Sequence, residues 1–455
     1  MIRRGLVVHR VPIGNGVLVG PVLMRSFRRG STTGAPPGRC HGPGRHALRP
    51  RDHHGRRDRP RPVRRCRRGA VDAAAGAASH APMPSRSSDA IVVGGGLVGA
   101  AIALGLSERG LDTVLLDEGD IAYRASRGNF GLVWVQSKGL GAPWYQRWTR
   151  RSAAEWPALA AALAARTGLD VALAQPGGVH LCLSEEEFDE RARRMAQMRA
   201  EAGNHGFEFR MIRAPELRDM LPGLGPAVIG ASFTPYDGHA SPLALLQALH
   251  RAFTAAGGEY VPAAAVTGGR AAPGDFRVET AAGAFAAPRL VLAAGLGNAE
   301  LAPLFGLSAP VRPQRGQILV TERARAVLPL PSTTIRQTGE GTIMLGDSME
   351  EVGFDTGQSP PVMAGIARRA VLSFPWIAEL NVVRAWSALR VMAPDGLPIY
   401  DQSERFPGAF TANCHSGVTL AAAHARLLAP MIAEGALDPV LAPFSAKRFD
   451  VPRAA

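Results

Sequence analysis

The stretch Asp89-Ala-Ile-Val-Val-Gly94-Gly-Gly96-Leu-Val-Gly99 is an apolar run that ends in a glycine-rich turn. The apolar run predicts a buried parallel strand. The Ala/Leu-rich residues 97–109 that follow predict a helix that stops at Gly110. Thr113–Asp117 is a second apolar run. Residues 89–117 therefore predict a β-α-β unit.

The glycine-rich turn has the spacing G-x-G-x-x-G, through Gly94, Gly96 and Gly99. The first Gly allows a tight turn, the second lets a pyrophosphate approach the backbone, and the third lets the helix pack on the strand. Leu97 and Val98 open the helix, whose first N–H groups favour phosphate. The turn therefore predicts a dinucleotide site, with a purely structural glycine turn as the alternative.

The end of the second strand supplies the acidic residue that such a site needs. Asp117 is the expected partner of a ribose hydroxyl, and Glu118 is the immediate alternative. These residues do not distinguish NAD from FAD.

Further elements extend this pattern along the chain. Strands are expected at 178–183, 207–212, 261–268, 289–295, 317–321, 342–345, 381–390 and 409–413, and helices at 143–167, 185–203, 242–256 and 417–434. Buried parallel strands at both ends of this body predict an α/β fold, in which a Rossmann-like domain is interrupted by an α+β domain with a mixed sheet. We place the nucleotide-binding parts at about 89–175, 240–305 and 390–435, and the second domain at about 176–239 and 306–389.

The formal charge of +14 over 455 residues is unevenly distributed. Residues 1–82 hold 18 Arg, three Asp and no Lys or Glu, a net charge of +15, whereas residues 83–455 hold 34 basic and 35 acidic residues. The basic segment has almost no apolar periodicity and is predicted to be disordered. It is interpreted as an extension without a folded role, with a nucleic-acid-binding arm or a targeting segment as alternatives. Nucleic-acid binding by the near-neutral body is not expected.

Four widely spaced cysteines form no CxxC pair, which argues against a disulfide scaffold, a structural zinc site or an iron–sulfur cluster in this chain. No metal site is therefore expected. No run of about 18 apolar residues is present, so no membrane span is predicted. A cytoplasmic setting is expected.

Several motifs beyond the glycine turn carry a resemblance to a known family. They are Ala125–Gly131, Ala293-Ala-Gly295, Asp395-Gly-Leu-Pro-Ile399 and His415-Ser-Gly417. Over residues 89–434 the chain resembles the FAD-dependent D-amino-acid/glycine/sarcosine oxidase superfamily. The resemblance implies non-covalent FAD. It places the following residues at the cofactor in addition to those of the glycine turn: Ser126, Arg127, Asn129, Val266, Ala294, Gly295, Gly396, His415, Gly417, Val418 and Thr419.

Within this superfamily, Asn129–Gln136 with Lys138-Gly139 looks most like the flavin (beta) subunits of opine oxidase and hydrogen cyanide synthase. This likeness implies oxidation of a C–N bond in an amino acid, an opine or another secondary amine, and an iron–sulfur partner subunit. The family commonly has Gly where this chain has Cys414. A small buried Cys in that place is the preferred interpretation, although it leaves a covalent link to the flavin conceivable.

Arg390 is the main candidate for the substrate carboxylate, because a planar guanidinium matches a carboxylate and the family places its carboxylate-binding Arg there. Arg336 and Arg315 are weaker candidates. His415 is assigned an electrostatic role beside the flavin in preference to that of a base.

Four other residues are weighed against simpler roles. His180 is read as a core or pocket-wall residue and His239 as a loop residue. Trp134 and Tyr145 are read as core residues in preference to walls of the substrate site. The predicted function is an FAD-dependent amine or amino-acid oxidoreductase. A nucleic-acid-associated flavoprotein and an electron-transfer subunit are the alternatives.

Overall fold

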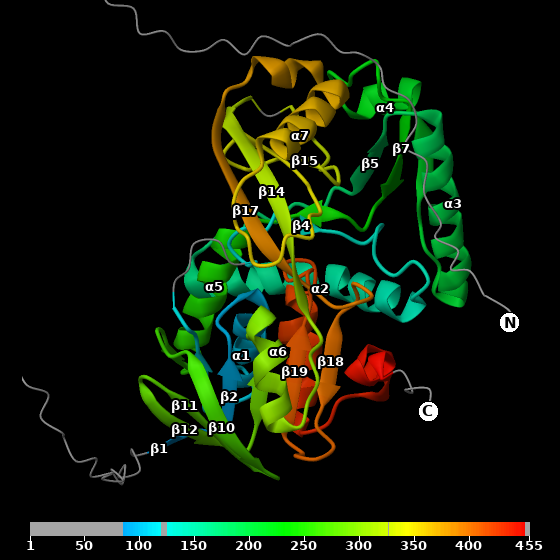
Figure 1. The fold of residues 1–455 in the computed structure, drawn as a ribbon. Coiled ribbons are helices and arrows are strands. Elements are labelled where there is room, and N and C mark those ends of the chain that lie inside the picture. Colours follow the sequence, from blue (N-terminus) through cyan, green and yellow to red (C-terminus); the bar gives the residue numbers. More distant parts are fainter. Residues whose placement is uncertain (1–84, 120–124, 326, 451–455) are drawn as a thin grey trace, which may run out of the picture. The chain divides into compact units, whose positions relative to one another are not determined.

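The nucleotide-binding part of the chain is built on a six-stranded sheet (Figure 1). The computed structural model describes residues 85–119, 125–325 and 327–450, so the basic segment 1–82 lies outside the described residues. The sheet order is β18 (Ile399–Gln402), β19 (Ala409–Asn413), β13 (Leu290–Leu292), β2 (Ala90–Val93), β3 (Thr113–Leu116) and β9 (Glu259–Val261). All neighbours pair in parallel except β18 with β19. The predicted β-α-β unit forms its centre.

Alternate residues of β2 enter different cores, as strand geometry requires. Ala90 and Val92 pack in a core with the helices, whereas Ile91 and Val93 pack in a second core on the opposite face. The helices that contribute to the first core include α1 (Leu97–Ser107), α2 (Pro143–Thr167), α5 (Pro242–Ala255), α8 (Ala421–Ala423), the π-helical turn η5 (His424–Leu428) and α9 (Ala429–Glu434). The second core is covered by the sheet β1 (Ser85–Ser87), β12 (Gly283–Ala287), β11 (Asp275–Thr280) and β10 (Val266–Ala272).

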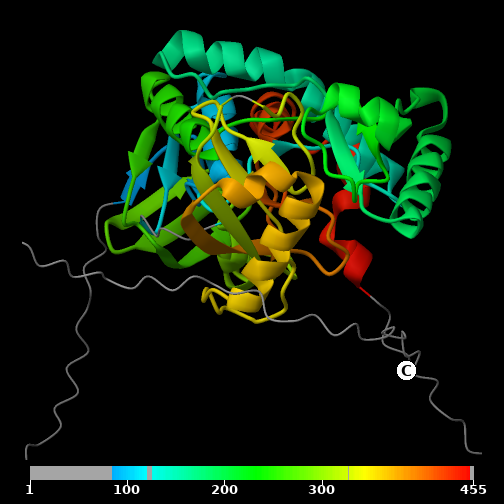
Figure 2. The same ribbon diagram turned by 90° about the horizontal axis from the view of Figure 1, so that it is seen from above.

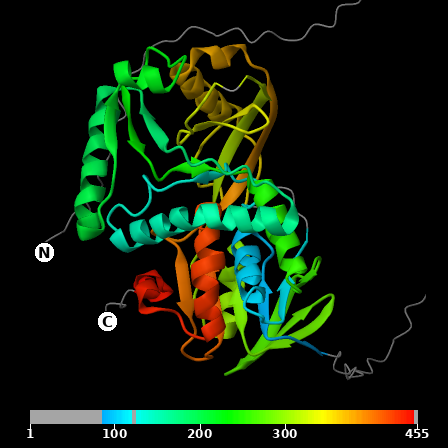
Figure 3. The ribbon, with the colours of Figure 1, turned by 180° about the vertical axis from the view of Figure 1, so that it is seen from behind.

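The second domain contains smaller sheets joined by a core of its own. One sheet has the order β15 (Ile335–Gln337), β16 (Thr342–Leu345), β14 (Arg312–Arg323) and β17 (Val382–Met392), and another has the order β5 (Gly178–Cys182), β7 (Gly230–Thr234) and β6 (Arg210–Arg213). The helices here are α3 (Glu185–Ala202), α4 (Ala214–Met220) and α7 (Pro360–Ser373). Helix α2 crosses between the two sets of sheets, as the view from behind shows (Figure 3). Seen from above, α3 and α7 lie on different sides of this domain (Figure 2).

Two predicted elements differ from the structure. The single strand expected at 261–268 is divided between β9 and β10, which belong to different sheets, because the chain turns at Ala263 with a φ of 53°. The helix expected at 417–434 begins at Ala421, because residues 416–420 form a separate turn in which Leu420 N donates to Ser416 O at 2.9 Å. Strands β11 and β12 and helix α7 were not predicted.

The remaining short elements are β4 (Leu132–Val133), which pairs with β8 (Gly238–His239), α6 (Asn298–Leu301), and the 3-10 turns η1 (Gly203–His205), η2 (Gly295–Gly297), η3 (Ala302–Phe305), η4 (Pro375–Glu379), η6 (Pro439–Phe444) and η7 (Ala446–Phe449). Strand β17 runs across the predicted domain limit near residue 390, and the residue limits of the two domains remain predictions.

Among the described residues, no single helix combines the length and the apolar composition that crossing a membrane requires. The bent pair Ala421–Glu434 and Pro439–Phe449 meets that test only jointly, by length and composition.

Candidate active site

The glycine turn between β2 and α1 is tightly enclosed by neighbouring backbone. Gly94 has a φ of +106°, and a Cβ there would lie 2.4 Å from the carbonyl oxygen of Ala293. A Cβ at Gly99 would lie 1.9 Å from the carbonyl oxygen of Gly94. Only glycine fits both positions. The turn therefore leaves the first N–H groups of α1, at Leu97 and Val98, at the carboxyl ends of the parallel strands, where nucleotides bind in such folds.

Asp117 lies beside this turn, at the end of β3. Its Oδ2 accepts a hydrogen bond from Gly95 N at 2.7 Å, and its Oδ1 accepts one from Gly119 N at 3.0 Å. The next residue is Glu118. Asp117 O also accepts a bond from Ala264 N at 2.7 Å, so the segment that leads to Val266 lies at the same strand end. The predicted ribose side of the site is thereby assembled from three separate segments.

The predicted flavin loop touches the start of α1. Ser126 Oγ accepts a hydrogen bond from Leu97 N at 2.9 Å, and Asn129 Oδ1 accepts one from Gly131 N at 2.8 Å. Arg127, between them, is partly buried. The loop also contacts the second domain, because Trp386 Nε1 on β17 donates to Gly128 O at 3.2 Å. It therefore links the glycine turn to the domain that was expected to hold the substrate.

Two further motifs of the resemblance, Ala293–Gly295 and His415–Gly417, follow strands β13 and β19 of the same sheet. Ala294 N donates to Asn298 Oδ1 at 3.0 Å, and Gly295, with a φ of 60°, makes the turn after β13. Gly417 lies close to Leu97, since a Cβ at Gly417 would be 3.5 Å from Leu97 Cβ.

Thr419 and Val418 are held by neighbouring elements. Thr419 Oγ1 donates to Leu132 O at 3.0 Å, and Val418 O accepts a bond from Trp156 Nε1 at 3.2 Å. The loop after β19 thus connects the start of α1 to β4 and α2.

Two pairs of side chains from distant segments lie near each other, since the charge of Arg390 acts on both Lys138 and His415. Lys138 Nζ lies 2.7 Å from His415 Nε2. Arg390 Nη2 lies 3.1 Å from Asp347 Oδ2, and Arg390 Nη1 donates to Ser348 O at 2.7 Å. Lys138, His415 and Arg390 are each partly buried. We refer to Lys138, Asp347, Arg390 and His415 as the catalytic cluster.

Burial disfavours the charged forms of the ionisable groups in and beside the catalytic cluster. Burial, assisted by the charge of Arg390, lowers the pKa of Lys138 from 10.5 to about 8. Burial and the neighbouring charges of Lys138 and Arg390 hold the pKa of His415 well below its usual value, so its imidazole is neutral. Burial raises the pKa of Cys414 to about 12, which keeps it a thiol and makes it a poor nucleophile. Gly396 neighbours the cluster through a backbone hydrogen bond with His415.

The other two arginine candidates are paired with groups outside the catalytic cluster. Arg315 forms ion pairs with Glu350 at 2.7 Å and Asp355 at 2.5 Å. Arg336 donates to Phe130 O, and its Nη1 lies 3.4 Å from His239 Nδ1. Burial lowers the pKa of His239 to about 4, with the charge of Arg336 as a second cause.

The remaining candidates face the interior. His180 Nδ1 lies 2.9 Å from Thr333 Oγ1, and burial lowers its pKa to about 3. Trp134 is 3% exposed and Tyr145 is 1% exposed. Tyr145 Oη lies 3.2 Å from Ser416 Oγ, one residue from His415. Tyr145 therefore helps to hold the loop that carries His415.

Sequence reasoning missed three participants in these contacts. Lys138 was noted only as part of a motif, and Asp347 was not considered, because both lie in loops that are distant in sequence from Arg390. His250 was also missed, although its Nε2 lies 2.7 Å from Gly95 O. The one available signal was the position of Lys138 just after the predicted flavin loop.

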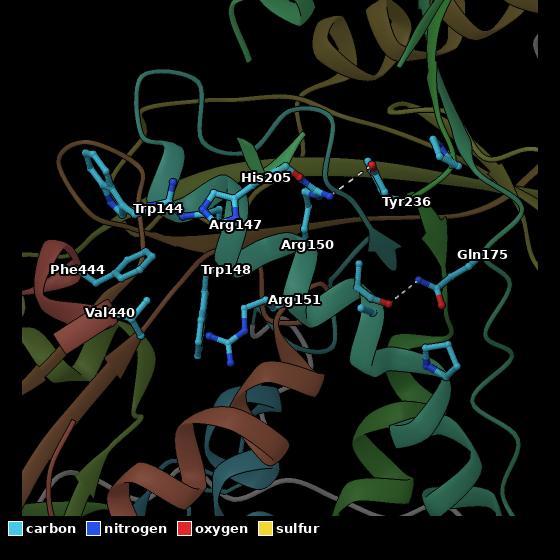
Figure 4. A pocket seen from close by; sticks show the side chains of 14 residues that line it. Trp144, Arg147, Trp148, Arg150, Arg151, Gln175, His205, Tyr236, Val440 and Phe444 are labelled. Carbon is cyan, nitrogen blue, oxygen red and sulfur yellow. Dashed lines mark hydrogen bonds between the residues drawn. The ribbon is translucent and has the colours of Figure 1, made fainter. Parts of the chain in front are cut away.

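A cavity of about 750 Å³ is lined by residues of α2 and of the segments at 175, 205, 235–236 and 440–444 (Figure 4). Trp144, Arg147, Arg151, Tyr236 and Phe444 are among its lining residues. None of the predicted site residues lines it, so the cavity does not contribute to the candidate active site. Across residues 85–119, 125–325 and 327–450, no group of three or more His, Cys, Asp or Glu residues is placed to hold a metal ion.

Residues 89–431 match the family model described as FAD dependent oxidoreductase. The chain belongs to this family. An opine oxidase subunit from Rhizobium meliloti is 45% identical over 366 residues, which cover 80% of this chain and 99% of that protein. Hydrogen cyanide synthase subunit HcnC from Pseudomonas aeruginosa is 29% identical, covering 80% of this chain and 97% of that protein. The crystal structure of glycine oxidase from Geobacillus kaustophilus superimposes with a TM-score of 0.73 at 28% identity, covering 79% of this chain and 98% of that one.

These findings confirm the predicted family, the amino-acid-oxidase fold and the FAD-dependent oxidoreductase activity. The geometry fits FAD, because glycines at 94 and 99 leave a backbone cradle that a Cβ would fill. The N-terminus of α1 would hold the pyrophosphate of FAD, Asp117 its ribose, and the loops at 126–129 and 415–419 its flavin end.

Proposed function

We propose that this protein oxidises the C–N bond of an amino acid or secondary amine of the opine, glycine or D-amino-acid type. One observation carries the proposal: Arg390 lies on β17, the strand whose Trp386 contacts the flavin loop at Gly128, and its charge acts on both Lys138 and His415. The names of the relatives agree with this substrate class, since they include an opine oxidase subunit and a glycine oxidase. When bound, FAD supplies the acceptor for a hydride equivalent from the carbon that bears nitrogen.

Arg390 would bind the substrate carboxylate. Its side chain is 24% exposed, and its partner Asp347 is 40% exposed. Such a partly solvated ion pair is weak, so a substrate carboxylate can replace Asp347 without leaving the guanidinium unpaired. Two parallel hydrogen bonds from one guanidinium also fix the orientation of a carboxylate.

His415 would act through its position and polarity. Because its imidazole is neutral, Nε2 can accept a hydrogen bond from Lys138 Nζ, and His415 adds no positive charge beside Arg390. The backbone of residues 415–419 is held by β4 and α2, so its N–H groups are available as fixed donors to a developing negative charge.

We further propose that the protein works in the cytoplasm with an iron–sulfur partner subunit. Two of the relatives are named as subunits, of opine oxidase and of hydrogen cyanide synthase. The chain's four cysteines lack cluster spacing, so an iron–sulfur cluster in the electron path would belong to the partner subunit. A partner co-expressed and co-purified with this chain should contain iron and acid-labile sulfide. A chain that purifies alone and passes electrons to oxygen at full rate would contradict this.

Anaerobic mixing of the FAD-loaded enzyme with glycine, D-amino acids, sarcosine, proline and opines tests the proposed function. Bleaching of the flavin absorbance by at least one of them is expected. Arg390→Met should then raise KM for that substrate about 10- to 100-fold, because a hydrogen-bonded charge contact is lost, and FAD should remain bound. Arg384→Met is the matched control, since Arg384 lies on the same strand but stacks on Trp386. An unchanged KM in Arg390→Met would refute the carboxylate assignment.

A further inference from the structure

The chain contains 50 Arg but only two Lys, Lys138 and Lys447. Lys447 is exposed and pairs with Glu404, as an Arg could do equally well. Lys138 is partly buried in the catalytic cluster. In a chain that uses Arg almost everywhere a cation is needed, a Lys in the active site points to a property that Arg lacks. That property is the ability to exist as a neutral amine near physiological pH.

The contacts of Lys138 favour the neutral form. In the described part of the chain, the one hydrogen-bond partner of its Nζ is the imidazole of His415, at 2.7 Å, and Nζ forms no ion pair there. Amines without a carboxylate partner lose their proton readily when water is excluded. The geometry therefore provides a base of the kind that enzymes make by partial burial.

The charges that face Lys138 come from several elements. Arg390 on β17 disfavours its protonated form, whereas Asp347 after β16 and Asp237 before β8 favour it at longer range. Burial outweighs both carboxylates, and the pKa of Lys138 falls to about 8. The neighbouring imidazole of His415 carries no charge, and the thiol of Cys414 none either.

We propose that Lys138 is the base that removes the proton from the ammonium group of the substrate. This inference rests on the proposed function. Amino acids and secondary amines enter as ammonium ions, and a C=N bond can form only when the nitrogen has a free lone pair. In the step, one N–H bond of the substrate breaks and one Nζ–H bond forms. The substrate nitrogen becomes neutral, and Lys138 becomes an ammonium that donates to His415 Nε2. No electrons are transferred, so no oxidant is needed.

Arg390 and Lys138 would then divide the recognition of the substrate. Arg390 holds the carboxylate, and Lys138 meets the nitrogen attached to the same carbon. The substrate carboxylate takes the place of Asp347 at Arg390, so the charge of Arg390, which disfavours protonation of Lys138, stays paired when the substrate is bound.

The low number of lysines makes a direct test possible. Holoenzyme labelled with ¹³C at lysine Cε should show two lysine signals, which Lys138→Met assigns. The signal of Lys138 should titrate near pH 8, whereas that of Lys447, whose pKa its partner Glu404 raises, titrates at higher pH and serves as the internal reference. If both signals titrate at the same pH, the proposal is overturned, and this result needs no variant.

Kinetics test the proton transfer itself. In Lys138→Met, kcat/KM at pH 7 should fall about 100-fold or more, and the deficit should narrow as the pH approaches the pKa of the substrate amine. Lys138→Arg should be equally impaired, because Arg remains charged. Lys447→Met should behave as wild type. Near-wild-type kcat/KM in Lys138→Arg would overturn the proposal, since Lys138 would then act as a cation only.

A failure of the proposed function and a failure of the proposed role of Lys138 give different results. If no amine bleaches the wild-type flavin, the proposed function is refuted, and the role of Lys138 with it. If amines bleach the flavin and Lys138→Arg reacts at the wild-type rate, only the proton-transfer role is refuted.

Discussion

The two ends of the active site are built in contrasting ways. At the nucleotide end, backbone atoms form the site, and the residues that matter are the ones whose side chains are missing, such as Gly94 and Gly99. At the catalytic end, side chains form the site, and they come from loops and strands at residues 138, 347, 390 and 415. The first kind of site tolerates almost no added atom, whereas the second depends on charges that can be changed one at a time.

Of the three changes that test this contrast, the one at the nucleotide end is expected to have the largest effect. Gly94→Ala places a Cβ 2.4 Å from Ala293 O in a backbone conformation with positive φ. The resulting shift of the backbone should weaken FAD binding by about 1–3 kcal/mol, which corresponds to roughly a tenfold to hundredfold loss of FAD affinity. Fluorescence titration of the apoprotein with FAD measures it.

Gly110→Ala is the control for this prediction. Gly110 also has positive φ, at +80°, but nothing lies within 4 Å of a Cβ there. It should lose stability without losing FAD affinity. Equal FAD affinity in Gly94→Ala and wild type would show that the turn does not form the pyrophosphate site.

An intermediate effect is expected where the two ends join. Ser126→Ala removes the acceptor for Leu97 N at the start of α1. The free energy of unfolding should fall by about 1 kcal/mol, as for other lost helix caps, and urea denaturation measures it.

Ser241→Ala is the matched change, since Ser241 caps α5 by accepting from Ala244 N. It should cost a similar stability and leave FAD affinity unchanged, whereas Ser126→Ala should alter both. An unchanged FAD affinity in Ser126→Ala, as in Ser241→Ala, would contradict this prediction.

The smallest effect is expected from a surface charge of the catalytic end. Asp347→Asn removes the carboxylate that competes for Arg390, so KM for a carboxylate substrate should decrease, by up to about fivefold for an exposed ion pair. Steady-state kinetics at low ionic strength measures it.

Glu351→Gln breaks the comparable pair with Arg312 on β14 and should leave KM unchanged. A higher KM in Asp347→Asn would mean that Asp347 positions Arg390 rather than competing with its substrate.

This contrast also explains what could be predicted from the sequence. The turn at Gly94–Gly99 and its strands were predictable, because their spacing is local and steric. Arg390 was predictable only through a family resemblance. The contact between Lys138 and His415 joins residues separated by 277 positions, and no periodicity or spacing rule reaches across such a distance. Strand β10 was missed as a separate element because Gly and Ala residues carry almost no strand pattern.

The order of strands in the main sheet has a consequence for synthesis of the protein. Strand β2, which ends at the glycine turn, lies between β3 and β13, and β13 lies between β2 and β19, at residues 409–413. Strand β2 therefore meets β3 early, but it waits for β13, and β13 waits for β19, both of which are made much later; such non-local pairing is slow. A nascent chain that stops before Ala409 lacks both β19 and the loop that carries His415. It follows that FAD capture and the catalytic cluster are completed together, only when nearly the whole chain has been made.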